Sequence, residues 1–178
     1  MVRRGAAVSG SGAPIAVLIG PPGAGKSTVG RLLADARGVA FVDTDQLVEQ
    51  RSGRSISDIF VEEGEAAFRT LEVEATREAL HGNGVVALGG GAPMQEAIAE
   101  LLSGHRVVFL DVTIADAAGR IGFDGSRPLL AVNPRATWTR MMKERRPTYE
   151  SLAAVRVDTG GRTPHQVVQE LGEQLEQE

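Results

Sequence analysis

The sequence contains no cysteine, few aromatic residues and no long apolar run. The absence of cysteine excludes disulfides, thiolate metal sites and a cysteine nucleophile. Aromatic residues make up 4% of the 178 residues, too few to favour the stacking platforms that bind single-stranded nucleic acid. No apolar run approaches the roughly 20 residues that span a bilayer, and the N-terminus lacks the apolar core of a secretory signal. We therefore expect a cytoplasmic protein.

The residues that are present have an ordinary globular balance. Hydrophobic residues make up 42% and charged residues 24%, and the formal net charge of -4 disfavours binding to nucleic acid or an anionic membrane. The length suits one domain with a substantial core. We predict a disordered tail over residues 1–14, a single domain over 15–178 and a monomeric protein with neither a membrane nor a nucleic-acid partner.

Short apolar runs alternate with longer amphipathic stretches, which is typical of βαβ units around a parallel sheet. Pro93 suits the first position of an intervening helix and Pro164 that of the last helix, and Phe68, Leu71 and Ala75 recur at helical spacing. The runs are rich in β-branched residues and apolar on both faces, as strands between two helix layers should be. They lie at 15–19, 39–43, 84–88, 106–110 and 154–158.

The stretch "GPPGAGKST" (20–28) has the pattern G-x-x-x-x-G-K-[ST] of a phosphate-binding loop. A predicted strand precedes it and a helical pattern follows it, as this loop requires. Its glycines allow successive backbone N–H groups to surround an anion, and a helix N-terminus adds partial positive charge. Lys26 can reach the β- and γ-phosphates, and the Ser27 hydroxyl can bind Mg²⁺. The stretch therefore predicts a nucleoside triphosphate site.

Two carboxylates, Asp43 and Asp45, lie at the C-terminal end of the second predicted strand in "FVDTDQ". Ligands of open α/β sheets bind along the carboxyl ends of the strands. Alternation along the strand would direct the two side chains differently, so that one carboxylate faces a metal ion and the other a substrate hydroxyl. The alternative is a helix cap in front of "QLVEQR". Asp111, at the end of "VVFLD", is a competing magnesium ligand, and the pattern alone leaves that choice open.

Two glycine-containing stretches are further candidates. "LGGGAP" (88–93) follows the third strand, where its glycines allow a ligand to approach the backbone closely; a flexible turn is the alternative. "GFDGSRPLLAVNPR" (122–135) falls where no strand is due. It is either an ordinary surface loop or a mobile lid that carries Arg127.

Together these stretches resemble the shikimate kinases. The matching signatures run in order from about Ile15 to the last helix, and their combination is far more specific than the phosphate loop alone. They are "GPPGAGKST", "FVDTD", "RSGRSISDIFVEEGEAAFR", "LGGGAP", "RPLL", "ERRPTY" and "VDTGGRTP". The resemblance implies a three-layer α/β fold of the P-loop nucleoside monophosphate kinase type. This fold has a five-stranded parallel sheet, a helical substrate-binding segment at about 44–72 and a mobile lid at about 122–135.

The resemblance also implies an activity and a set of site residues. The reaction would be transfer of the γ-phosphoryl group of ATP, with Mg²⁺, to the 3-hydroxyl of shikimate, on the route to chorismate and the aromatic amino acids. The implied nucleotide site comprises Gly23, Ala24, Gly25, Lys26, Ser27, Thr28, Arg120, Arg127, Arg162 and Pro164. The implied shikimate site comprises Asp45, Arg69, Gly89, Gly90, Gly91 and Arg145. Ser27 and Asp43 would lie at the metal, and Asp45, Lys26 and Arg127 would be catalytic.

Two assignments within this set depend on the family pattern. Arg145 is chosen over its neighbour Arg146 because the family places the carboxylate-binding arginine two residues before the proline. With Asp43 at the metal, Asp111 has a structural role. The rival functions are another small-molecule kinase of this fold, such as a gluconate kinase, and a regulatory module that binds nucleotide without catalysis.

Overall fold

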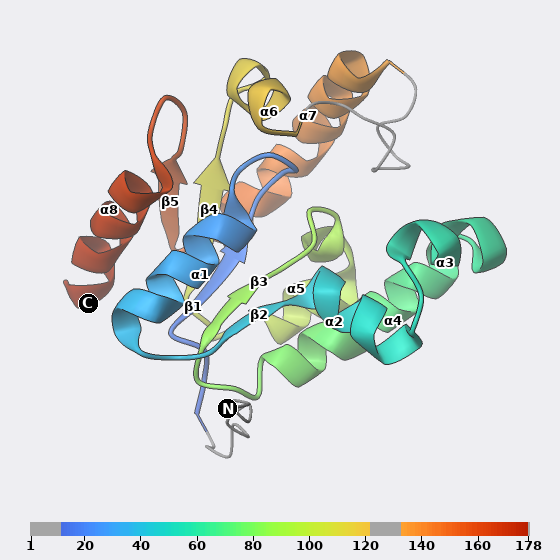
Figure 1. Ribbon diagram of the computed structural model, residues 1–178, viewed down its shortest axis with the longest axis horizontal. Coiled ribbons are helices and arrows are strands. Elements are labelled where there is room, and N and C mark those ends of the chain that lie inside the picture. Colours follow the sequence, from blue (N-terminus) through green and yellow to red (C-terminus); the bar gives the residue numbers. More distant parts are fainter. Residues whose placement is uncertain (1–11, 122–132, 178) are drawn as a thin grey trace, which may run out of the picture.

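The computed structural model describes residues 12–121 and 133–177 (Figure 1). Five parallel strands form one sheet with helices on both of its faces, which confirms the predicted three-layer α/β fold. Each strand lies within two residues of the range predicted for it. The strands are β1 (Ala16–Ile19), β2 (Phe41–Asp43), β3 (Val85–Ala87), β4 (Val107–Asp111) and β5 (Val155–Asp158).

The strand order is β2-β3-β1-β4-β5, so the strand that leads into the phosphate loop is central. Every residue of β1, β3 and β4 is buried, because helices cover both faces of these inner strands. The edge strands are more exposed: β2 is half-buried, and Val157 is the buried residue of β5. Leu18, Ala87 and Asp43 stand in register on adjacent strands. The phosphate loop, the glycine run and Asp43 therefore leave the sheet side by side.

Helices form a layer on each face of the sheet (Figure 1). On one face, α1 (Lys26–Arg37) packs against α8 (Pro164–Glu176). The opposite face carries α4 (Glu65–Ala79), α5 (Glu96–Leu101) and α7 (Pro134–Leu152). Right-handed crossovers require this division, because the chain moves one way along the sheet from β1 to β2 and the other way in its later crossovers.

A compact helical group follows β2. Helices α2 (Thr44–Ser52) and α3 (Ile56–Glu63) pack on α4 around a small separate core. That core contains Val48, Ile59, Phe68 and Ala75. The helical segment predicted at about 44–72 is therefore present, and it continues to the end of α4.

Three boundaries differ from the predictions or lie beyond the described part. Pro93 lies in a short 3₁₀ turn, Ala92–Met94, and α5 starts only at Glu96. Of the predicted lid, 122–132 lie outside the described residues, whereas Pro134 and Arg135 already belong to α7. Helix α6 (Ile114–Ile121) precedes that segment.

Among the helices that the structure describes, none is both long and apolar enough to cross a bilayer.

Candidate active site

The phosphate loop connects β1 to α1 through a backbone that only glycine adopts readily. Gly20, Gly23 and Gly25 have φ values of 148°, 84° and 87°. A Cβ atom on Gly20 would lie 2.4 Å from the carbonyl oxygen of Leu110, so no larger residue fits there. No described side chain caps the N-terminus of α1. The first N–H groups of α1 therefore point into the loop, where an anion can accept from them.

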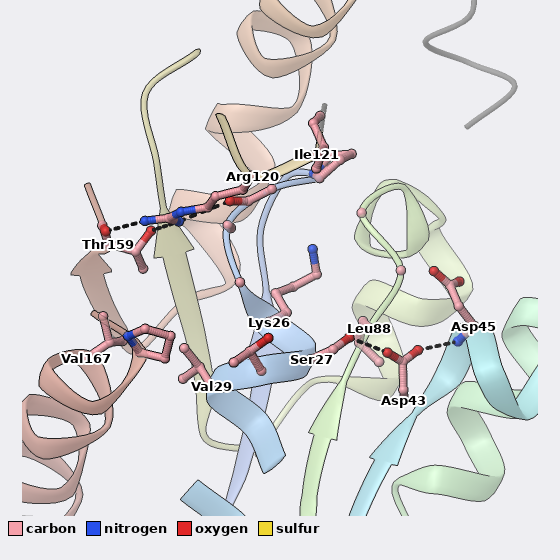
Figure 2. A pocket seen from close by; sticks show the side chains of 18 of the residues that line it. Lys26, Ser27, Val29, Asp43, Asp45, Leu88, Arg120, Ile121, Thr159 and Val167 are labelled. Carbon is pink, nitrogen blue, oxygen red and sulfur yellow. Dashed lines mark hydrogen bonds between the residues drawn. The ribbon is translucent and has the colours of Figure 1, made fainter. Parts of the chain in front are cut away.

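Lys26 is the first residue of α1, and its side chain turns back over the loop. Its Nζ donates to the carbonyl oxygens of Gly20 and Pro21, at 2.7 and 3.1 Å. Figure 2 shows Lys26 between Arg120 on one side and Asp45 on the other. These residues line a cavity of about 490 Å³ that continues from the phosphate loop to the glycine run. A cavity of this size is typical of a small-molecule site.

Asp43 ends β2 and uses its two carboxylate oxygens differently. Oδ2 accepts a hydrogen bond of 2.5 Å from the Ser27 hydroxyl, and Oδ1 accepts one of 3.0 Å from the amide of Asp45 (Figure 2). Oδ1 also accepts from the amide of Gln46 at 3.3 Å, so it caps α2. The helix-cap alternative drawn from the sequence therefore holds for this residue, and its other oxygen binds the Ser27 hydroxyl. A hydroxyl and a carboxylate beside a phosphate loop are the hard oxygen donors that Mg²⁺ prefers, and Mg²⁺ keeps waters and phosphate oxygens as its other ligands. The donor set fits this metal.

Asp45 lies in the first turn of α2, so the prediction that it lies at the end of the strand is wrong. The Asp43 cap starts the helix, and this turn of helix, rather than strand alternation, separates the two carboxylates. The side chain of Asp45 lines the cavity beside Gly89. A Cβ atom on Gly89 would lie 2.6 Å from Asp45 Oδ1, so the carboxylate and the backbone of the glycine run are close together.

The other two glycines of the run each adjoin an arginine. A Cβ atom on Gly90 would lie 3.3 Å from Nη1 of Arg145, and one on Gly91 would lie 2.6 Å from Nη2 of Arg69. The structure therefore gathers the whole predicted acceptor set around one turn of backbone. Arg69, Arg145 and Gly91 do not line the 490 Å³ cavity itself; they flank the glycine run that forms part of its wall.

Arg69 is held by a buried carboxylate that the sequence analysis did not single out. Glu72 is 1% exposed, and its Oε1 accepts from Arg69 Nη1 at 2.8 Å and from Gln95 Nε2 at 2.9 Å. Burial raises the pKa of Glu72, and the Arg69 charge offsets only part of that rise. Burial acts to lower the pKa of Arg69, but Glu72 and Glu65 outweigh it and raise that pKa. The i,i+3 spacing of Arg69 and Glu72 was the available signal.

Asp111 forms ion pairs with two arginines and does not line the candidate cavity. Arg146 donates to both of its oxygens, at 2.8 and 2.9 Å, and Arg156 donates to Oδ2 at 2.6 Å. Burial acts to raise the pKa of Asp111, but these hydrogen bonds outweigh it and hold the pKa below its ordinary value. The structural role expected for Asp111 fits this geometry. Arg146 therefore faces the sheet, while Arg145 faces the glycine run.

We expect Asp111→Asn to lower the free energy of unfolding at pH 7 by about 1.5–3 kcal/mol, the range for hydrogen bonds to charged groups. The side chains of Arg146 and Arg156 are 35% and 57% exposed. Because water screens exposed charges, we expect a loss in the lower part of that range. Because the folded-state pKa is lowered, the contribution is complete above the ordinary aspartate value of about 3.9 and disappears as the pH falls through the lowered one. Urea unfolding across this pH range should show that the difference in unfolding free energy between wild type and variant decreases in acid. Equal free energies of unfolding for wild type and variant at pH 7 would contradict the account.

The predicted adenine-side residues lie at the other end of the cavity. Arg120 donates to the carbonyl oxygens of Gly23 and Thr159, at 3.0 and 2.6 Å (Figure 2). Arg162 donates to the carbonyl oxygen of Asp158 at 3.0 Å and pairs with Glu170. Pro164, the first residue of α8, also lines the cavity, as do Thr159 and Val167, which the sequence analysis missed. Arg127 lies outside the described residues.

Comparisons with known proteins agree with one another. The shikimate kinase family model matches residues 22–176. The chain is 53% identical to the shikimate kinase of Thermobifida fusca over 93% of this chain and 96% of the relative. It is 52% identical to that of Streptomyces coelicolor, over 88% and 92%.

Solved structures give the same result at lower identity. The shikimate kinase of Acinetobacter baumannii in complex with shikimate is 34% identical, with a TM-score of 0.89 over 93% of both chains. That of Aquifex aeolicus is 35% identical, with a TM-score of 0.79 over 90% of this chain and 95% of the other. These neighbours share the P-loop kinase fold that the sequence predicted. Since the family model covers most of the chain, the protein belongs to the shikimate kinase family of ATP-dependent kinases.

Proposed function

We propose that this protein transfers the γ-phosphoryl group of ATP to the 3-hydroxyl of shikimate, giving shikimate 3-phosphate and ADP. One observation carries the proposal. A single cavity joins the phosphate loop to Asp45 and to the glycine run, which Arg69 and Arg145 flank. Membership of the shikimate kinase family supports the same acceptor, and a relative at 34% identity has been solved with shikimate bound. The product is an intermediate on the route to chorismate and the aromatic amino acids.

On the donor side, we assign the phosphates to the loop and the N-terminus of α1. The N–H groups of Gly23, Ala24, Gly25, Lys26, Ser27 and Thr28 would surround the phosphate oxygens. Ser27 and Asp43 would hold Mg²⁺, which supplies positive charge to the phosphate oxygens when bound. Lys26 and Arg127 would add charge to the leaving and transferring oxygens. Arg120, Arg162 and Pro164 would line the adenine end.

On the acceptor side, we assign the carboxylate of shikimate to two guanidinium groups. Arg145 lies beside Gly90 and Arg69 beside Gly91, the next residue of the glycine run, and a planar guanidinium binds a carboxylate through two hydrogen bonds. The amides of Gly89, Gly90 and Gly91 would add backbone contacts. These contacts lie away from the reacting oxygen and would fix the 3-hydroxyl beside Asp45.

The proposed reaction is a single in-line displacement. The 3-hydroxyl oxygen forms a bond to the γ-phosphorus, while the bond from that phosphorus to the β–γ bridging oxygen breaks. Asp45 orients the hydroxyl and accepts its proton, and the bridging oxygen leaves as part of ADP. Such transition states are loose, so the protein contributes mainly position and neutralising charge.

An acceptor panel tests this function. ADP release is measured with MgATP and, separately, shikimate, gluconate or a nucleoside monophosphate. We expect acceptor-dependent ADP release only in the reaction that contains shikimate. Preferential turnover of gluconate or a nucleotide would identify a different kinase, and nucleotide binding without acceptor-dependent release would indicate a regulatory module.

We also propose that the enzyme acts as a monomer in the cytoplasm. The support for a monomer is that all the described site residues converge within one chain, with no residue needed from a second copy. The proposed donor, ATP, is consistent with a cytoplasmic enzyme.

We expect Arg69→Ala to raise the KM for shikimate about 10- to 100-fold, the cost of a lost charged hydrogen bond. The KM for ATP should change far less, because Arg69 lies on the acceptor side of the cavity. Arg77→Ala is the matched control, since Arg77 is an exposed arginine on the same helix. Equal increases in both KM values would show that Arg69 acts on the fold rather than on the acceptor.

A further inference from the structure

Helix α7 contacts both loops of the candidate site. The indole Nε1 of Trp138 donates to the carbonyl oxygen of Pro22 in the phosphate loop, at 2.9 Å. The hydroxyl of Tyr149 donates to the carbonyl oxygen of Gly90 in the glycine run, at 2.5 Å. One helix therefore holds the backbone of the nucleotide side and that of the acceptor side.

The two loops also touch each other at the point where α7 holds them. A Cβ atom on Gly90 would lie 3.3 Å from Cδ of Pro22 and 3.5 Å from the carbonyl oxygen of Gly20. The relative position of nucleotide and acceptor therefore depends on this junction. A change in either loop would move the acceptor hydroxyl relative to the γ-phosphate.

Both donors on α7 are fixed by burial. Trp138 is 3% exposed and Tyr149 is 0% exposed. The Tyr149 ring packs on Phe109 of β4, with the ring centroids 5.2 Å apart. Burial raises the pKa of Tyr149 to about 12, although Arg145 and Arg69 oppose the rise. The phenol is therefore protonated at neutral pH and can donate to Gly90.

The hydrogen bond to Gly90 also determines how the next peptide is oriented. In a trans peptide the carbonyl and the following N–H point in opposite directions. With the Gly90 carbonyl directed at Tyr149, the N–H of Gly91 points away from it. Glycine has the freedom to rotate such a peptide, so a glycine run benefits from a fixed partner.

The rotation of α7 about its own axis is set separately. Arg146 binds Asp111 at the end of β4 through two hydrogen bonds. Consecutive residues of a helix point about 100° apart, so this contact directs Arg145 to a different side, toward Gly90. Tyr149 follows Arg145 by one helical turn and faces the same glycine.

We propose that α7 fixes the donor–acceptor geometry, with Tyr149 as the positioning residue of the acceptor loop and Trp138 as that of the phosphate loop. Neither side chain needs to touch a substrate, because each acts through a backbone carbonyl. The inference rests on the proposed function, since it takes the glycine run as the shikimate side.

The test compares Tyr149→Phe with Trp138→Phe by calorimetric titration with shikimate and, separately, with MgADP. Each variant removes one hydrogen bond to a loop carbonyl, and Tyr149→Phe also removes the hydrogen bond between the phenol and Arg145. We expect Tyr149→Phe to raise the Kd for shikimate about 5- to 10-fold, with the Kd for MgADP changed less than about twofold. Trp138→Phe should do the reverse: the Kd for MgADP should rise about 5- to 10-fold, and the Kd for shikimate should change less than about twofold. Thr139→Val is the control, because it removes an exposed hydroxyl that donates to the carbonyl oxygen of Arg135 within α7.

The outcomes separate the positioning roles from general damage. Equal shifts in both Kd values, or no shift in either, would overturn the role of the residue concerned. A measurement on the wild-type enzyme covers the case in which a variant does not fold: amide exchange at Gly91 should slow when shikimate binds, and unchanged exchange would overturn the role of Tyr149. Wild-type protein that does not turn over shikimate would instead refute the proposed function.

Discussion

Asp45→Asn is expected to lower kcat with shikimate at least about 100-fold, the scale of lost general-base or orienting help. The carboxylate lines the cavity beside Gly89, opposite the phosphate loop. An amide of nearly the same size can still donate or accept a hydrogen bond, but it cannot take the proton of the acceptor hydroxyl. The loss should therefore fall on the chemical step.

Three measurements would isolate this effect. The Kd for MgADP should be unchanged in the variant, because Asp43 rather than Asp45 lies at Ser27. Asp35→Asn, an exposed change on α1, should retain wild-type kcat. Near-normal turnover of shikimate by Asp45→Asn would remove Asp45 from the mechanism.

Lys26→Met should lower kcat by about 100- to 1,000-fold, which corresponds to about 3–4 kcal/mol of lost charge stabilisation. Methionine keeps much of the length of the side chain and removes its charge. Lys26 also donates to the loop carbonyls of Gly20 and Pro21, so the variant needs a check on its melting temperature. The KM for shikimate should be little affected, since Lys26 acts on the phosphates.

Lys143→Met is the matched control for this prediction. Lys143 is the only other lysine in the sequence and is exposed on α7. It should retain wild-type kcat and wild-type KM values. If Lys26→Met kept its kcat while losing only affinity for ATP, Lys26 would bind the ground state and the transition state equally.

The sequence was sufficient to predict the sheet and the phosphate loop because both depend on local patterns. Each strand is a short apolar run, and the loop places its glycines where left-handed backbone is needed. The ends of the helices and strands were harder to predict where a helix cap competed with the strand pattern. Asp43 caps α2 and ends β2, so Asp45 lies on a helix rather than on the strand that its alternation suggested. The short 3₁₀ turn after the glycine run likewise delays α5.

The contacts that support the site could not be predicted from local patterns. Asp111 meets Arg146 and Arg156 only because β5 pairs with β4 and α7 packs across them. The burial of Glu72 beside Arg69 depends on how α4 packs, although the spacing of the two residues was visible. Tyr149 was visible in "ERRPTY" as part of a family signature, but its bond to Gly90 joins residues 59 positions apart.

The most direct test of the central claim is a crystal structure with Mg²⁺, a non-hydrolysable ATP analogue and shikimate. We expect an Asp45 carboxylate oxygen within about 3.2 Å of the shikimate hydroxyl that faces the γ-phosphate. Arg69 and Arg145 should both bind the shikimate carboxylate. An Asp45 side chain directed away from that hydroxyl, with the two arginines on other partners, would contradict the account.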